Sequence, residues 1–174
     1  MEEIEVKILE INKEDIIRRL ENLGAKEVFK GSMNSIYFDT KDNRLKNNKM
    51  VLRIREKGIK NFITLKVKKE DEEVKLNDEF EIEISNFAIT KEILNRLELI
   101  ETISDIRKRT SYKIKNSLVE IDEYEEPKIP TFLEVESPNK DELKEIVELL
   151  GFTMKDTKNW GGNRLLQFYN QRFQ

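Results

Sequence analysis

The stretch EIEVK at residues 3–7 alternates charged and apolar side chains. Glu3, Glu5 and Lys7 occupy every second position, with Ile4 and Val6 between them. This period of two is that of a β-strand with one apolar face and one charged face. Glu and Lys are poor strand formers, so the charged face needs an explanation. Either it faces water, or it faces something that itself carries charge.

Six later stretches repeat this alternation. Their charged positions are Arg53 and Arg55 in LRIR, Lys66 and Lys68 in TLKVK, Glu79, Glu81 and Glu83 in EFEIEI, Arg107 and Arg109 in IRKR, Glu120 and Asp122 in VEID, and Glu134 and Glu136 in LEVE. A sheet face that is simply exposed to water would mix Ser, Thr, Gln and both charges. These strands instead carry charges of one sign, so water alone does not explain the pattern.

Like charges that are adjacent on one face of a sheet repel each other and destabilise the fold unless they are compensated. Basic strands could pair with acidic strands, or both kinds could surround a charged ligand. A metal-bound polyphosphate offers oxygens to Arg and Lys and a divalent cation to carboxylates. If the strands close into a barrel, the charged face lines the lumen and helices cover the apolar outside. The pattern therefore favours an α+β fold with an antiparallel sheet whose charged face surrounds a ligand, and a closed barrel is one arrangement that would provide it.

The composition excludes several classes of site. The 174-residue chain is 39% charged with a net charge of -3, and it contains neither cysteine nor histidine. Disulfides, thiolate zinc sites, cysteine nucleophiles and Ser-His-Asp triads are therefore excluded. Metal ligands would have to be carboxylates, which suit Mg²⁺ or Mn²⁺. An acidic pI near 5.4 argues against general nucleic-acid binding.

The remaining pattern predicts helices over residues 12–24, 89–100 and 139–152. In the second helix, Ile93, Leu94 and Leu97 are expected to form the inner face. Residues 69–78 resemble a solvated connection, and Gly58 marks a hairpin turn. No flexible linker interrupts the chain, so we expect a single domain over residues 1–174. No signal peptide or membrane span is apparent, which predicts a cytoplasmic protein.

EIEVK resembles the ExExK signature of the CYTH domain, also called the triphosphate tunnel metalloenzyme family. YFDT, LRIR, TLK, EFEIE, RKR, VEIDEY and FLEVE follow in the order of the family's strands, so the resemblance covers essentially the whole chain. It implies an eight-stranded antiparallel barrel whose tunnel binds a triphosphate and a divalent metal. Members include class IV adenylyl cyclases, thiamine triphosphatases and inorganic triphosphatases.

Carried over by motif position, the resemblance implies two sets of site residues. A basic set would bind the triphosphate: Lys7, Arg53, Arg55, Lys66, Arg107, Arg109 and Lys158. An acidic set would hold Mg²⁺ or Mn²⁺ and position water: Glu3, Glu5, Glu81, Glu120, Asp122, Glu134 and Glu136. Catalysis is expected of Glu5, Lys7, Arg53 and Arg55. Lys158 either caps the tunnel or is a surface lysine, and Trp160 either stacks on a substrate ring or contributes hydrophobic packing.

The resemblance leaves the reaction open. The segment YFDTKDNRLKNNKMVLRIR is similar to the plainer form seen in triphosphatases, because the cyclase-like members carry a longer segment there. We therefore expect a metal-dependent hydrolase of an inorganic or organic triphosphate. The alternatives are an adenylyl cyclase and a non-catalytic module that binds polyphosphate or nucleotides. The expected partner is a small-molecule triphosphate, with no membrane, and a homodimer is left open.

Overall fold

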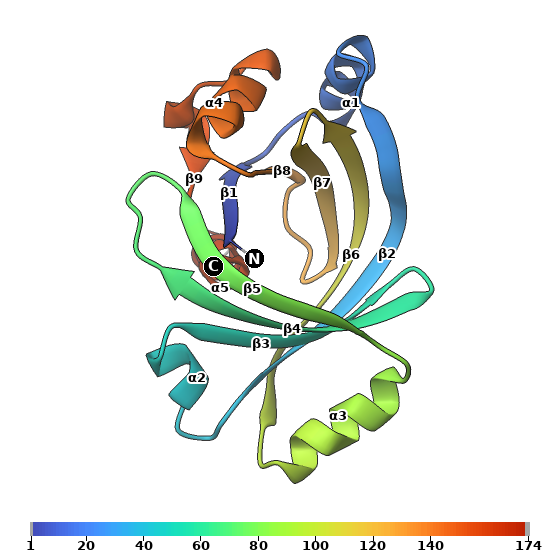
Figure 1. Ribbon diagram of the computed structural model, residues 1–174, viewed down its shortest axis with the longest axis vertical. Helices are drawn as coiled ribbons and strands as arrows, with labels where there is room; N and C mark the ends of the chain where they lie inside the picture. Colours follow the sequence, from blue (N-terminus) through green and yellow to red (C-terminus); the bar gives the residue numbers. More distant parts are fainter. Residues whose placement is uncertain (1, 173–174) are drawn as a thin grey trace.

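The computed structural model describes residues 2–172, and side chains from Ile4 to Arg172 (Figure 1). Eight antiparallel strands close into a barrel in the order β5-β4-β3-β2-β6-β7-β8-β1, with β1 pairing back onto β5. The strands are β1 (Glu2–Ile8), β2 (Lys26–Asp39), β3 (Met50–Lys57), β4 (Lys60–Lys69), β5 (Lys75–Ile84), β6 (Ile100–Ile114), β7 (Ser117–Glu126) and β8 (Phe132–Ser137). The predicted barrel is confirmed.

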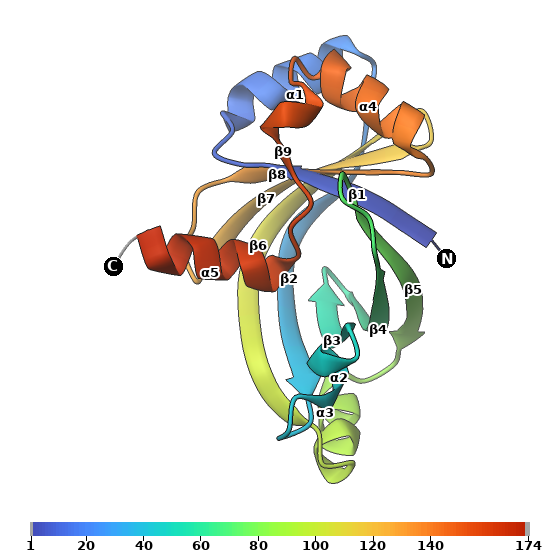
Figure 2. The ribbon, with the colours of Figure 1, turned by 90° about the vertical axis from the view of Figure 1, so that its left-hand side faces the viewer.

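The helices lie outside the barrel, as predicted (Figures 1 and 2). They are α1 (Lys13–Asn22), α2 (Arg44–Asn47), α3 (Phe87–Arg96), α4 (Lys140–Leu149) and α5 (Gly162–Arg172), with a 3-10 turn at Met154–Asp156. Within residues 2–172, no helix has the length and apolar character that a membrane crossing requires.

The main core lies between the barrel wall and two of these helices. Val6, Val119 and Val135, from the apolar faces of β1, β7 and β8, are fully buried with Leu20 of α1 and Ile146 of α4. Burying these side chains is the principal stabilising term of this half of the molecule. Because the apolar faces of the strands point outward to the helices, their charged faces point inward.

The structure corrects the predicted connection over residues 69–78. β5 begins at Lys75, and Lys75 to Asp78 pair with Glu5 to Glu2 of β1. This pairing closes the barrel, and it satisfies backbone groups on the edge of β1 that would otherwise lack partners. The short strand β9 (Thr157–Lys158) pairs with Lys7 and Ile8 farther along β1. β5 and β9, which are distant in sequence, thus pair with successive parts of the same edge of β1.

The predicted inner face of the second long helix is also wrong. α3 ends at Arg96, and only Leu94 of the three expected residues is buried. Ile93 is 53% exposed and Leu97 is 66% exposed. The reason is that α3 contacts the barrel through a small cluster that includes Leu94, Phe87 and Ile54, and its remaining apolar side chains face outward.

The C-terminal tail forms α5, which the sequence pattern did not predict. Leu165, Leu166 and Tyr169 of α5 pack against Tyr124 and Phe132. Those two rings come from β7 and β8, with centroids 5.8 Å apart. Figure 2 shows α5 lying beside one end of the barrel. This helix therefore covers the end of the tunnel at which Tyr124 and Phe132 lie.

Candidate functional site

Charged side chains from all parts of the barrel wall meet in its interior. Arg53, Arg55, Arg107 and Arg109 are buried, as are Glu5, Lys7, Glu120, Asp122 and Glu134. Nearly complete burial of so many charges is expensive unless each is paired or awaits a ligand. The ion pairs divide this interior into two regions, which differ in how well their charges are compensated.

The first region, which we call the paired wall, comprises Glu5, Lys7, Arg109, Glu120, Asp122 and Glu134. The ammonium of Lys7 donates to Glu5 at 2.6 Å and also to Glu134. The Lys75 ammonium lies 2.8 Å from the same Glu5 carboxylate. Each of these charges thus has an opposite charge in direct contact.

Arg109 holds the other half of the paired wall. Its Nε and Nη2 donate to the two oxygens of Asp122, at 2.6 and 2.5 Å, in the bidentate geometry that suits a guanidinium. Nη1 donates to Glu120, which also accepts a 2.8 Å hydrogen bond from the Ser111 hydroxyl. Nη2 lies 3.6 Å from Glu134. One arginine therefore compensates three carboxylates.

The pKa directions follow from this pairing. Burial and the nearby Glu134 carboxylate would both raise the pKa of Glu5, but Lys7, Lys75 and Lys66 together lower it to about 2. Burial would likewise raise the pKa of Glu134, and Lys7 and Arg109 bring it well below its usual range. Glu5 and Glu134 are accordingly ionised at neutral pH.

The second region, which we call the arginine wall, comprises Arg53, Arg55 and Arg107. Arg53 donates a long 3.3 Å hydrogen bond to Thr64 and lies 3.8 Å from Glu81. Among the described residues, the Arg55 guanidinium donates a single hydrogen bond, of 3.4 Å, to Ser35. Both distances lie beyond the usual hydrogen-bond range. These two cations are therefore buried with little compensation.

Arg107 is the member of the arginine wall that also contacts the paired wall. Its Nη1 donates to the Tyr124 hydroxyl at 2.5 Å and lies 3.2 Å from Asp122. Its Nε has no hydrogen-bond partner, and the nearest carboxylate oxygen, on Asp105, is 3.6 Å away. The Nε of Arg53 is also buried without a partner. Buried donors rarely stay unsatisfied, so the arginine wall has the character of an oxyanion-binding surface.

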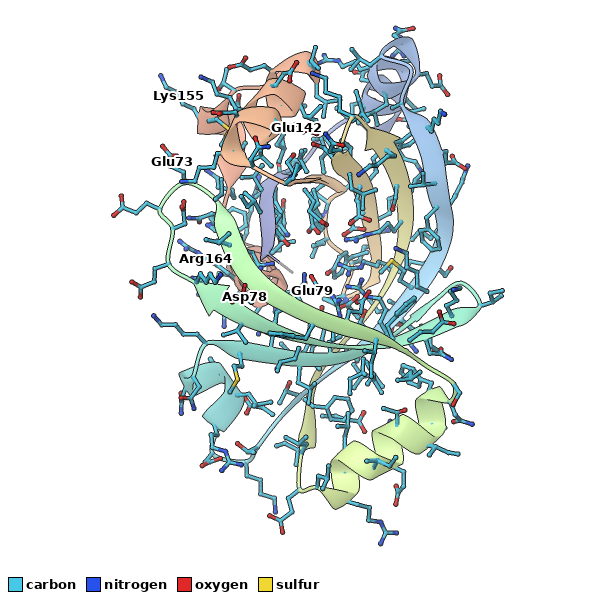
Figure 3. The ribbon with its side chains drawn as sticks, viewed as in Figure 1. Glu73, Asp78, Glu79, Glu142, Lys155 and Arg164 are labelled. Carbon is cyan, nitrogen blue, oxygen red and sulfur yellow. The ribbon has the colours of Figure 1, made fainter. Side chains whose placement is uncertain are left out.

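Other predicted site residues are less buried, although the Lys66 ammonium lies 4.0 Å from the Glu5 carboxylate of the paired wall. Lys66 pairs with Glu79 at 2.8 Å, and Glu81 accepts a 2.7 Å hydrogen bond from Thr64. Figure 3 shows Glu79 at the barrel opening, whereas Glu73 and Lys155 project outward. Lys68 and Glu83 are exposed, and Glu83 pairs with Lys60 at 2.8 Å.

Four further predicted positions lie on β1, β8 and the segment that leads into α5. Glu136 is opposite Glu5 in the β1–β8 pairing, and Lys158 is opposite Lys7 in β9. The side chain of Glu3 lies outside the part of the chain whose side chains are described. Trp160 lies with its ring centroid 5.1 Å from that of Phe168 and joins the cluster around α5, which is the packing role.

Several tunnel residues were missed by the sequence reasoning. Lys75 and Asn77 of β5, Ser35 and Tyr37 of β2, and Asp105 of β6 are paired in register with residues of the site. In β5 and β6, extending the alternation by two to four residues would have found Lys75, Asn77 and Asp105. Lys75 continues the pattern of Glu79 backward, and Asp105 continues that of Arg107.

The carboxylates suit a divalent cation in ligand type, but they do not form a preassembled cage. Within the part of the chain that the structure describes, no three acidic side chains gather as a cation site. Glu120 and Glu134 are directly opposite each other in β7 and β8. Mg²⁺ is commonly held by one or two carboxylates together with substrate phosphates, so this pair fits such a cation.

Comparison with known proteins connects this tunnel to a family. The sequence model of the CYTH domain matches residues 1–160. A Methanocaldococcus jannaschii protein named "Putative adenylate cyclase MJ0240" is 31% identical over 157 residues, which cover 86% of this chain and 88% of that protein.

Solved structures agree with this relationship. The PH1012 protein of Pyrococcus horikoshii superposes with a TM-score of 0.77 at 27% identity, covering 91% of this chain and 96% of that one. The Hippeastrum protein HpAC1 superposes with a TM-score of 0.65 at 18% identity, covering 98% and 95%, and so shares the fold. The chain belongs to the CYTH domain family.

Proposed function

We propose that this protein is a metal-dependent hydrolase that cleaves a phosphoanhydride bond of a triphosphate bound in the tunnel. The observation that carries the proposal is the arginine wall, where buried guanidinium groups retain unpaired N–H donors. Phosphate oxygens are strong acceptors that match the fork geometry of arginine. Arg53 and Arg55, two residues apart on β3, would contact successive phosphates, and Arg107 would contact them from β6.

Phosphoryl transfer depends mainly on positioning and on neutralising charge, which this tunnel could provide without a nucleophilic side chain. Arg53, Arg55 and Arg107 would stabilise the charge on the phosphate oxygens. Glu120 and Glu134 would hold the cation, with Lys7 and Arg109 keeping both carboxylates oriented. When bound, Mg²⁺ or Mn²⁺ would supply neutralisation of the phosphates and activation of water.

The role of Glu5 follows from its low pKa. A carboxyl group with a pKa of about 2 is a weak base at neutral pH, because an efficient general base has a pKa near the working pH. We therefore propose that Glu5 orders Lys7 and Lys75 and contributes to the cation's surroundings, rather than removing the proton from water.

Adenylyl cyclase activity is the second candidate, and one observation favours it. The 31% identical relative is named a putative adenylate cyclase. The same tunnel could serve both reactions, since the attacking oxygen is water in one and a ribose hydroxyl in the other. A non-catalytic binding module would retain the arginine wall without turnover.

A turnover panel separates these candidates. Tripolyphosphate, ATP and thiamine triphosphate are each incubated with the protein and Mg²⁺ or Mn²⁺, and phosphate, pyrophosphate and cyclic AMP are quantified separately. Hydrolysis releases phosphate from at least one compound. Cyclic AMP with pyrophosphate from ATP would replace the hydrolase assignment by the cyclase. Binding without any product would support the non-catalytic module.

A further inference from the structure

A cavity of about 260 Å³ opens next to the charged interior. It is lined by Val28, Phe29, Lys57, Lys60, Phe62, Ser111 and Leu118. Two phenylalanine rings and a leucine make its wall largely apolar, and both charged lining residues are lysines. Apolar walls with a few polar groups are typical of sites for small organic molecules.

This cavity lies at the end of the tunnel that α5 does not cover. Along β7, Leu118 lines the cavity, Glu120 and Asp122 belong to the paired wall, and Tyr124 contacts α5. Leu118 and Tyr124 are six residues apart, which corresponds to roughly 20 Å along a strand. A substrate whose triphosphate lies in the charged interior can therefore extend toward Leu118, but not toward Tyr124.

Two contacts join the cavity directly to the proposed phosphate site. Phe62 is the cross-strand partner of Arg55, so their side chains are neighbours on the same inner face. Ser111 lines the cavity and donates its hydroxyl to Glu120, which Arg109 holds. A group bound in the cavity would consequently be separated from the arginine wall on β3 by Phe62, and from the paired wall on β6 and β7 by Ser111.

The ring of Phe29 is held in a defined position. A Cβ atom added at Gly31 would lie 3.2 Å from Phe29 Cζ, so the absence of a side chain at Gly31 leaves room for the ring to lie along β2. The Lys57 ammonium lies 4.8 Å from the ring centroid, within cation–π range. Lys57 thereby places a positive charge beside an aromatic surface, which suits an aromatic group joined to a polyanion.

From this geometry we infer an aromatic subsite, formed by Phe29 and Phe62, that binds a flat ring carried by the triphosphate, such as the base of a nucleoside triphosphate. The inference rests on the proposed function and narrows it from triphosphates in general to organic ones. A base stacks on an aromatic side chain through its π-face, so losing one ring is expected to weaken binding about ten-fold.

The test compares ATP with tripolyphosphate, which has no ring. Initial rates of consumption of each compound are measured with Mg²⁺ by phosphorus NMR, for the wild type and for Phe62→Leu and Phe29→Leu. Leucine keeps an apolar side chain but removes the ring. Phe80→Leu is the matched control, because Phe80 lies on β5 and is 60% exposed, away from the cavity lining. Melting temperatures confirm that each variant is folded.

We expect KM for ATP to rise about ten-fold in Phe62→Leu and Phe29→Leu, while KM for tripolyphosphate stays within about two-fold and Phe80→Leu changes neither. Equal changes for both compounds, or no change for either, would overturn the aromatic subsite. So would a wild type that consumes tripolyphosphate but neither consumes ATP nor is inhibited by it. Failure of the wild type to consume tripolyphosphate, ATP or thiamine triphosphate would instead refute the proposed hydrolase, and the subsite with it.

Discussion

The paired wall and the arginine wall lie in one barrel and bury similar charges, yet they differ in compensation. In the paired wall, Arg109 contacts Asp122 through two hydrogen bonds of 2.6 and 2.5 Å. In the arginine wall, Arg53 and Arg55 donate bonds of only 3.3 and 3.4 Å. Each nitrogen of the Arg109 guanidinium is hydrogen-bonded to a carboxylate, whereas the guanidinium groups of Arg53 and Arg55 lack close acceptors. The difference indicates which charges support the fold and which await an anionic ligand.

The largest expected effect concerns activity in the arginine wall. Arg53→Ala should lower kcat/KM for the preferred triphosphate by about 10³-fold, because a charged donor to the transferring phosphates is lost. Its stability should change little, since Arg53 makes only weak contacts in the free protein. Initial-rate kinetics measure the effect, with Arg96→Ala as an exposed control on α3. Undiminished activity in Arg53→Ala would contradict the assignment of this wall.

A mutation in the paired wall should mainly lower the stability of the fold, in contrast to a mutation in the arginine wall. Arg109→Met should reduce the free energy of unfolding by about 3–5 kcal/mol, because it leaves Glu120 buried without its counter-charge and Asp122 with Arg107 alone. Arg53→Met, made at a site with weak contacts, should cost less than about 1 kcal/mol. Urea unfolding followed by circular dichroism compares the two variants. Equal losses would remove the distinction between the walls.

Cation binding provides a third test of the comparison. Because no three described carboxylates gather as a cation site, Mg²⁺ or Mn²⁺ alone should shift the melting temperature very little. With tripolyphosphate present at 100 times its Kd, the complex should stabilise the fold by about 2.7 kcal/mol. Thermal unfolding with cation, tripolyphosphate, both and neither measures this. A full shift with cation alone would indicate a preassembled metal site instead.

The pH dependence of stability should report on Glu5. Its folded pKa of about 2 lies below its ordinary value of 4.5, so its ion pairs stabilise the fold above pH 4.5. This contribution is lost as the pH falls toward 2. Urea unfolding at pH 6 and pH 3 should show a smaller loss for Glu5→Gln than for the wild type. Glu83→Gln, at an exposed position, should lose as much as the wild type.

The strand pattern predicted the barrel and the charged lumen because a period of two assigns every second side chain to one face. Glu5, Lys7, Arg107 and Asp122 could be placed inside for that reason. The pattern did not reveal which charges pair with each other, because pairing depends on register. Arg109 contacts Asp122 since these two residues are directly opposite each other in β6 and β7. No local feature of either stretch specifies that alignment.

The failures of prediction have different physical causes. Lys75 was assigned to a solvated connection because acidic residues precede it, although the strand partner it provides for β1 lies 70 positions away in sequence. α5 was missed because two glycines at its start, Gly161 and Gly162, read as a loop. Ile93 and Leu97 follow helical periodicity, but the barrel offers α3 only a narrow contact.

A crystal structure of the complex with Mg²⁺ and tripolyphosphate would test the central claim most directly. We expect phosphate oxygens within about 2.7–2.9 Å of the guanidinium nitrogens of Arg53 and Arg107, including the Nε atoms that lack partners in the free protein. The ion pairs between Arg109 and Asp122 should remain. A triphosphate bound outside the barrel, or one that contacts the paired wall while the two Nε atoms stay unsatisfied, would contradict it.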